Sequence, residues 1–199
     1  RDWGIKLFIF SNPIGFLSSE NYYKEMVNVY YEYYHALQES AFIDEELGDT
    51  FEFGDDTRRG PHWFYSGAST FMADYAVRKR NPENNLDPIK EWLKQQFLYG
   101  QSLIEQSGCY EITLKDISPE NCFLLKFYWG EPAIAYLLTT IDNPNALNEL
   151  FYPNLYELGF KNAFEFTFNR TLEEFYLEWN SIMSKSIDER IVLIDSFGV

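Results

Sequence analysis

Apolar and aromatic residues recur at steps of three and four along several stretches of the chain, which is the spacing of one face of an α-helix. The clearest stretch runs from about residue 20 to residue 39, with Ser18 or Ser19 as its cap. The same spacing and the flanking turn residues predict further helices over residues 63–80, 88–98, 123–141, 145–158, 163–168 and 172–184. The pattern therefore predicts a mainly α-helical protein.

A few stretches do not follow the helical spacing. Residues 5–10, Ile-Lys-Leu-Phe-Ile-Phe, alternate and are rich in β-prone side chains, which is typical of a strand. Residues 110–114 are a possible short extended piece, and residues 44–61 are acidic and rich in glycine, which favours a loop. The last ten residues are apolar, so either a strand or a docked tail is expected there.

Several helix ends carry local signals. Asp87 followed by Pro88 predicts a helix start, with the aspartate as the cap and the proline in the first turn. Pro153 predicts an irregular middle for the helix over residues 145–158. Thr171 with Glu174 forms the pattern Thr-x-x-Glu, in which two orphan backbone N–H groups are satisfied reciprocally.

The composition is that of a globular protein with a large aromatic content. The chain has 199 residues, of which 19% are aromatic, so one domain with a substantial core is expected over residues 1–199. Within it, residues 1–80 hold the strand and the first two helices, and residues 81–199 form a helical subdomain. No apolar run approaches the roughly 20 residues that a membrane-spanning helix needs.

The net charge and the two cysteines bear on the binding partners and the location of the protein. A formal net charge of −15 repels nucleic-acid phosphates, so nucleic-acid binding is not expected. Acidic charge keeps a protein soluble, and it also suits a basic partner. Cys109 and Cys122 are either bridged or free, and they only weakly favour a location outside the cytosol.

The most informative stretch for chemistry is Val29–Gln38, which reads Val-Tyr-Tyr-Glu-Tyr-Tyr-His-Ala-Leu-Gln. In zinc peptidases with the pattern H-E-x-x-H, two ligands four residues apart share one helix face, and the glutamate between them polarises the attacking water. Here Tyr31 stands at the first histidine position, Glu32 at the base position and His35 at the second histidine position. The stretch resembles the H-E-Y-x-H-x-x-Q helix of the gluzincin metallopeptidases.

A second fragment carries the same resemblance. Gluzincins take their third ligand, a glutamate, from a following helix whose surroundings read W-x-x-E-G-x-A. This chain has Trp63-Phe64-Tyr65-Ser66-Gly67-Ala68 at the expected distance downstream. The tryptophan and the glycine match the family, but Ser66 stands where the glutamate ligand is expected.

Two further fragments extend the resemblance to roughly residues 20–185. Tyr128-Trp129-Gly130 resembles the Y-x-G helix of the family's helical domain, and residues 163–176 resemble its final F-G-x-S-L-E-E-F-Y pattern. The resemblance implies a thermolysin-like catalytic helical domain. The strand over residues 5–10 is then a short remnant of the β-sheet that usually lies beside it.

The resemblance implies zinc, but the donors for zinc are incomplete. A catalytic zinc site takes three protein ligands and a water molecule. His35 supplies one ligand, whereas Tyr31 offers a phenol with an ordinary pKa near 10 and Ser66 a neutral hydroxyl. We therefore expect no metal or other cofactor, a vestigial base position at Glu32, and a polar cluster that fills the metal's place. Rescue by His62 as a ligand, or a Ser66–His35–Glu32 triad, are the weaker alternatives.

These observations predict a catalytically inactive pseudopeptidase that acts as a binding or scaffolding module for a peptide or a basic protein. The alternatives are an active peptidase or hydrolase with an atypical metal or Ser/His site, and a structural subunit with a vestigial cleft. The residues expected to line the cleft are Tyr31, Tyr34, His35, Gln38, His62, Trp63, Ser66 and Tyr128.

Overall fold

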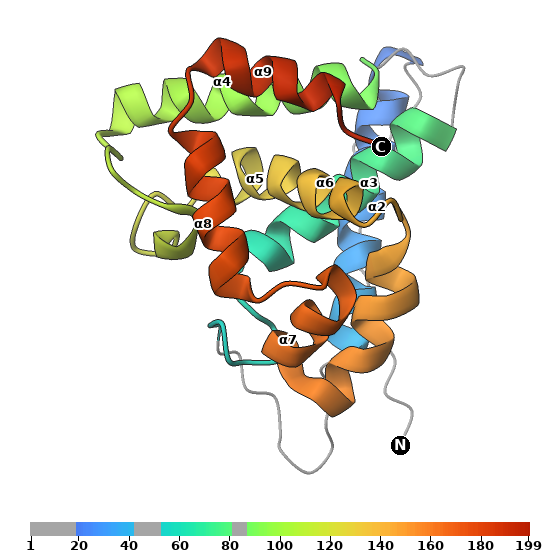
Figure 1. Ribbon diagram of the computed structural model, residues 1–199. Coiled ribbons are helices and arrows are strands. Elements are labelled where there is room, and N and C mark those ends of the chain that lie inside the picture. The colour runs from blue at the N-terminus through green and yellow to red at the C-terminus, as the bar shows by residue number, and fades with distance from the viewer. Residues whose placement is uncertain (1–18, 42–52, 81–86) are drawn as a thin grey trace.

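The computed structural model describes residues 19–41, 53–80 and 87–199, and over these ranges the protein is built from helices (Figure 1). The longer helices are α2 (Ser19–Ser40), α3 (His62–Arg80), α4 (Ile89–Ser107), α6 (Gly130–Thr140), α7 (Tyr152–Phe168), α8 (Leu172–Met183) and α9 (Ile187–Asp195). The prediction of a mainly α protein is confirmed, and no strand occurs in the described ranges. The predicted strand over residues 5–10 lies outside them.

The two helices that carry the motif residues lie where the hydrophobic spacing predicts them. Helices α2 and α3 pack against each other along much of their length, and α3 also crosses α6 (Figure 1). The predicted cap of α8 is confirmed, because the Glu174 N–H donates to Thr171 Oγ1 at 3.2 Å and the Thr171 N–H donates to the Glu174 carboxylate at 2.8 Å. None of the described helices is both long and apolar enough to cross a membrane.

Helix α4 is longer than the sequence pattern predicts. It begins after Pro88 instead of being capped by Asp87, and it continues to Ser107. Gly100 does not end the helix. The glycine leaves room for the Trp129 side chain, which packs against the helix at this position. A Cβ atom at Gly100 would lie 2.6 Å from the indole nitrogen of Trp129. The helix ends at Gly108, which has a φ of 72° and so adopts the left-handed conformation typical of a helix end.

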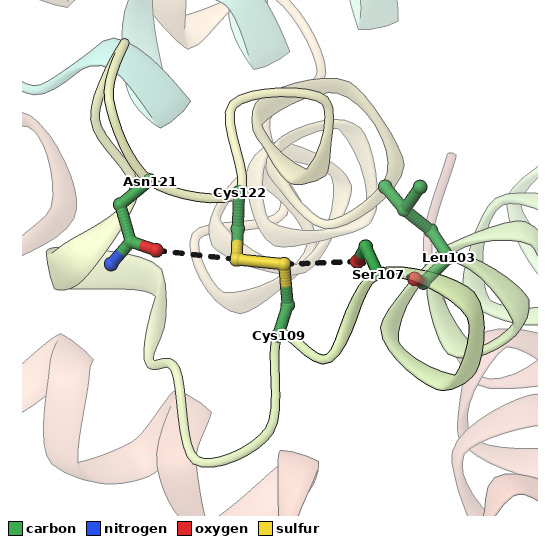
Figure 2. Close-up of a disulfide and its surroundings, with 5 residues drawn as sticks. All are labelled: Leu103, Ser107, Cys109, Asn121 and Cys122. Carbon is green, nitrogen blue, oxygen red and sulfur yellow. Dashed lines mark hydrogen bonds between the residues drawn. A yellow bond between two sulfur atoms is a disulfide. The ribbon is translucent and has the colours of Figure 1, made fainter.

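The predicted extended piece over residues 110–114 is wrong. This segment forms a turn followed by the 3-10 helix η1 (Leu114–Asp116), and Glu111 has a φ of 66°, which a strand does not tolerate. A disulfide joins Cys109 and Cys122 across the loop (Figure 2), which resolves the two alternatives left by the sequence. The crosslink fixes the loop against the C-terminal end of α4, where the Ser107 hydroxyl bonds to the Leu103 carbonyl at 2.6 Å.

The single buried helix predicted over residues 123–141 is two helices. The short α5 (Leu125–Tyr128) ends at Trp129, and α6 follows at once. At the start of α6 the backbone of Gly130 touches α3: a Cβ on Gly67 would lie 2.5 Å from the Gly130 carbonyl carbon. Only glycine at both positions allows this approach.

The predicted helices over residues 145–158 and 163–168 are both present, and they meet at a kink within α7. The π-helix η2 (Leu147–Phe151) leads into α7, and Pro153 lies in the first turn of α7, where its missing N–H is not needed. The irregularity expected at Pro153 therefore lies just before it. Gly159, with a φ of 72° and a ψ of 168°, is not helical and kinks α7. The break that the sequence predicts after residue 158 is therefore present as a kink between two helical parts of α7.

Aromatic side chains fill the core between α3, α7 and α8. The largest fully buried ones are Trp63, Phe64, Phe71, Phe97, Phe151, Phe160, Phe164, Phe168, Phe175 and Trp179. The end of the chain covers this core as a docked tail after α9, with Phe197 and Val199 buried and the Gly198 N–H donating to Thr139 Oγ1 at 3.1 Å. The strand expected as one alternative for the last ten residues is wrong, and the docked tail is correct only for residues 196–199, because residues 190–195 belong to helix α9, which the sequence did not predict.

Candidate functional site

His35 lies at the interface of α2 and α3, enclosed by aromatic rings. The Tyr31 ring meets it edge-on, with ring centres 4.4 Å apart, and the Tyr65 ring of α3 stacks on it at 4.6 Å. Ser69 Oγ lies 3.1 Å from His35 Nε2. Burial lowers the pKa of His35 to about 4, and the positive charge of Lys126 acts in the same direction. The imidazole is therefore neutral at neutral pH.

The hydroxyl that contacts His35 belongs to Ser69 and not to Ser66. Ser69 lies one turn further along α3, at the position where the family pattern W-x-x-E-G-x-A has its last alanine. It is fully buried, and its Oγ also lies 2.9 Å from the Ser66 carbonyl and 3.2 Å from the Tyr65 carbonyl. Ser66 itself is buried in α3. A polar cluster thus fills the space beside His35, with a different serine from the one the sequence indicated.

Zinc is the metal that the resemblance implies, and the donors at this position do not fit it. His35 offers one imidazole, whose Nε2 already contacts a hydroxyl. Burial raises the pKa of Tyr31 to about 12, with the charge of Glu32 adding to the effect, so the phenol stays protonated. Glu32 is exposed to solvent. Among the residues that the structure describes, no three His, Cys, Asp or Glu side chains come together as a metal site.

Two residues predicted to line the cleft are instead interior links to other helices. Gln38 is 1% exposed, and its Nε2 donates to the Tyr65 carbonyl at 3.0 Å and to the Tyr152 hydroxyl at 2.8 Å. The Tyr34 hydroxyl donates to Asn148 Oδ1 at 3.0 Å. These bonds fasten α2 to η2 and α7, so Gln38 and Tyr34 hold the helix that presents Tyr31 and His35.

A cavity of about 460 Å³ opens between α2, α3, α4 and α5. Two of the predicted cleft residues, Tyr31 and Tyr128, line it. The full lining is Val27, Asn28, Tyr31, Thr70, Asp74, Trp92, Gln96, Tyr99, Phe127 and Tyr128. Five of these ten residues are aromatic, so the cavity has the apolar walls and the few polar groups that are typical of a ligand site.

A buried acidic pair, Asp74 and Glu131, adjoins this cavity, because Asp74 lines it. Asp74 of α3 is 1% exposed, and its Oδ1 accepts a hydrogen bond from Arg78 Nε at 2.6 Å. Glu131 of α6 is 0% exposed, and the polar groups that act on its carboxyl include the Asp74 carboxyl and the Trp92 indole. Burial raises the pKa of Glu131 well above its usual value, and the charge of Asp74 raises it further. Burial also raises the pKa of Asp74, against the opposing effect of Arg78.

The remaining predicted cleft residues, His62 and Trp63, lie away from this cavity. The His62 ring stacks on Phe53 at 3.8 Å and lines a separate pocket of about 550 Å³. Trp63 is fully buried in the core, and its indole N–H donates to the Tyr176 hydroxyl at 3.1 Å. The predicted cleft is therefore divided among a cavity, a second pocket and the protein interior.

Sequence reasoning missed four polar residues of this region: Ser69, Asp74, Lys126 and Glu131. Lys126 Nζ lies 3.5 Å from the centre of the Phe123 ring and 4.7 Å from that of Phe127. Burial lowers the pKa of this amine to about 8. Lys126 and Glu131 could have been found from the sequence, because they are the charged residues of the otherwise apolar segment 123–141. Burying a charged group is costly, so such a residue usually has a structural or functional role.

Comparison of the chain with protein-family models, with curated proteins and with solved structures finds no match. The gluzincin resemblance therefore depends on the motif residues of this chain. Three of the fragments that carry it meet in space: Tyr31 and His35 of the first face α3, and Gly67 of the second touches Gly130 of the third.

Proposed function

We propose that this protein is a catalytically inactive relative of the gluzincin peptidases that binds a peptide segment of a partner protein. The observation that carries the proposal is the aromatic cavity between α2, α3, α4 and α5. The cavity adjoins helices α2 and α3, which hold the histidine-containing motif. Tyr31 lines the cavity and also contacts His35 of the motif. A cavity of this size accommodates one or two side chains of an extended peptide.

The chemistry beside His35 favours binding over hydrolysis. Ser69 and His35 are close enough for a nucleophile and its base, at 3.1 Å. However, Ser69 is fully buried in the middle of α3, and two backbone carbonyls lie within hydrogen-bond distance of its Oγ. A substrate carbonyl cannot approach such a hydroxyl without unfolding the helix. The pair therefore supports a structural link between α2 and α3, and not a serine hydrolase.

The charge of the protein favours a basic partner. A net charge of −15 raises the encounter rate with positively charged segments. Aromatic walls add to this, because aromatic faces attract the cationic groups of lysine and arginine. We therefore propose that the ligand is an extended peptide segment that carries basic residues. We expect the protein to bind such segments without cleaving them.

The test uses a library of fluorescent peptides, with binding read by anisotropy and peptide integrity by mass spectrometry. We expect saturable binding of basic peptides and no new fragments after prolonged incubation. Tyr99→Ala removes a half-exposed ring from the cavity wall, and Tyr110→Ala removes a similarly exposed ring elsewhere; the two side chains are 49% and 65% exposed. Tyr99→Ala weakens binding by roughly tenfold, as expected for one aromatic contact.

Three outcomes contradict the proposal. Cleavage at defined peptide bonds means that the protein is an enzyme. Equal loss of affinity in Tyr99→Ala and Tyr110→Ala means that the ligand does not occupy this cavity. No saturable binding to any peptide in the library means that the cavity is not a peptide site.

A further inference from the structure

The cavity carries a charge arrangement that selects one kind of ligand. Asp74 lines it from α3, and the fully buried Glu131 of α6 interacts with Asp74. Among the described residues, the charged groups that act on Glu131 are Asp74 and Arg78 of α3, and α4 contributes the Trp92 indole as a polar partner. A carboxyl group that is 0% exposed is costly when ionised, and the charge of Asp74 beside it adds to this cost.

Among the described residues, the charges around the pair balance only while Glu131 keeps its proton. Arg78 supplies a positive charge and is paired with Asp74 at 2.6 Å. Burial raises the pKa of both acids, and the charge of Asp74 raises that of Glu131 further. When no ligand is bound, the Arg78 guanidinium and the Asp74 carboxylate are therefore charged, and Glu131 is a neutral carboxylic acid. A second cation beside Asp74 would allow Glu131 to ionise, which gives two cations and two carboxylates.

The walls of the cavity suit such a second cation. The rings of Tyr31, Trp92, Tyr99 and Tyr128 surround the space that Asp74 faces. Arg78 already lies over the Trp92 ring, with its guanidinium carbon 4.3 Å from the ring centre. Several electron-rich rings with one carboxylate form the environment in which an alkylammonium group is held after it loses its water.

We infer that the cavity is a recognition site for a lysine-type ammonium group and that binding of this group releases the proton shared by Asp74 and Glu131. The inference rests on the proposed function and specifies its ligand. The ammonium group lies against the Asp74 carboxylate and the aromatic rings. The proton leaves Glu131 through Asp74 to solvent, so one proton is released for each cation bound.

The test compares two small probes, N-acetyl-lysine methylamide and its neutral analogue N-acetyl-norleucine methylamide. Binding is followed through the NMR signal of the Trp92 indole N–H between pH 5 and pH 8. At pH 8 we expect the lysine probe to bind about tenfold more tightly than the norleucine probe, which is the range of a desolvated cation–π and charge contact. The preference decreases as the pH falls, because the acid pair then holds its proton more firmly.

Two variants and a control separate the roles of the acids. Glu131→Gln imitates the protonated acid, so we expect it to bind the lysine probe with little dependence on pH and more weakly than the wild type at pH 8. Asp74→Asn removes the carboxylate that faces the ligand, and the preference for lysine over norleucine disappears. Glu111→Gln makes the same charge change at an exposed position and leaves both the preference and its pH dependence unchanged.

Each remaining outcome decides a separate claim. Equal binding of both probes at pH 8 overturns the cation site but leaves the cavity as a binding site for apolar side chains. A lysine preference that is constant with pH overturns the link to the acid pair. If neither probe shifts the Trp92 signal, the inference fails, and failure of the peptide library as well would remove the proposed function.

Discussion

Gly67 of α3 and Gly130 of α6 lie in backbone contact: a Cβ atom on Gly67 would stand 2.5 Å from the carbonyl carbon of Gly130. A Cβ on Gly130 would stand 2.6 Å from the carbonyl oxygen of Trp63. The two helices therefore cross with no side chain between them. This crossing sets the position of α3, which presents Ser69 to His35 and Asp74 to the cavity.

Replacement of Gly67 by alanine should destabilise the fold. The new methyl group meets backbone atoms, which cannot rotate away as a flexible side chain does, so α3 and α6 must separate. We expect a loss of about 2–3 kcal/mol in the free energy of unfolding, measured by urea denaturation.

Gly54 provides the matched control for this substitution. The nearest atom to a Cβ at Gly54 is a Thr57 methyl carbon at 3.6 Å, which is an ordinary contact. Gly54→Ala should change stability by less than about 0.5 kcal/mol. Equal stability of the two variants would show that α3 and α6 do not approach as closely as described.

Stability should fall in mild acid because of His35. Its pKa is lowered by burial to about 4 in the folded state, from an ordinary value of 6.5. Between these two values the unfolded chain binds a proton at this side chain and the folded chain does not, so stability is lost as the pH falls. The loss reaches about 3 kcal/mol near pH 4 if the whole shift is realised.

His35→Gln should remove this part of the pH dependence, as measured by urea denaturation at pH 7, 6, 5 and 4. The carboxylates titrate in the same range, so the quantity to compare is the difference between wild type and variant. His62→Gln serves as the control, since burial lowers the pKa of His62 too but to a smaller extent. A wild type and a His35→Gln variant with parallel pH profiles would contradict the buried, neutral imidazole.

Lys126 should be the most reactive lysine of the described residues near neutral pH. Burial between two phenylalanine rings lowers its pKa to about 8, with no ion pair to it among the described residues. At pH 7.5 about a quarter of this amine is unprotonated, against about a thousandth of an ordinary lysine. Brief labelling with a limiting amount of an acylating reagent, followed by peptide mass spectrometry, should modify Lys126 before the other lysines of the described residues.

The labelling rate of Lys126 should reach half of its maximum near pH 8. Lys161, a largely exposed lysine, is the internal comparison. If both lysines show the same pH profile, the environment of Lys126 is more hydrated than its place between Phe123 and Phe127 indicates.

The sequence predicted the helices better than the contacts between them. The spacing of apolar residues placed α2 and α3 closely, because most of the stabilisation of these helices comes from one buried face. The pattern ended α4 too early at Gly100, since glycine disfavours a helix locally. A glycine is needed at position 100 because Trp129 packs against it. The two residues are far apart in the chain, so the local sequence around Gly100 does not indicate this contact.

The candidate site was predicted only in part, because helical spacing is a local signal and the contacts between helices are not. Helical spacing correctly placed Tyr31 and His35 on the side of α2 that meets α3. It did not distinguish a cleft from the interior, so Gln38 and Trp63 were assigned to the cleft although they are buried. Ser69 was missed because the family pattern directs attention to position 66. Glu131 was missed although it is a charged residue in an apolar segment, and its interaction with Asp74 depends on how α3 and α6 cross.

We propose that α2 and α3 form a gluzincin-type site in which Tyr31 and Ser66 stand at two of the three zinc-ligand positions. The direct test is zinc content, measured by metal analysis after dialysis, of the wild type and of the double variant Tyr31→His, Ser66→Glu. Circular dichroism verifies that the variant is folded. We expect no stoichiometric zinc in the wild type and one zinc ion per chain in the folded double variant. Stoichiometric zinc in the wild type, or none in the folded double variant, would contradict this proposal.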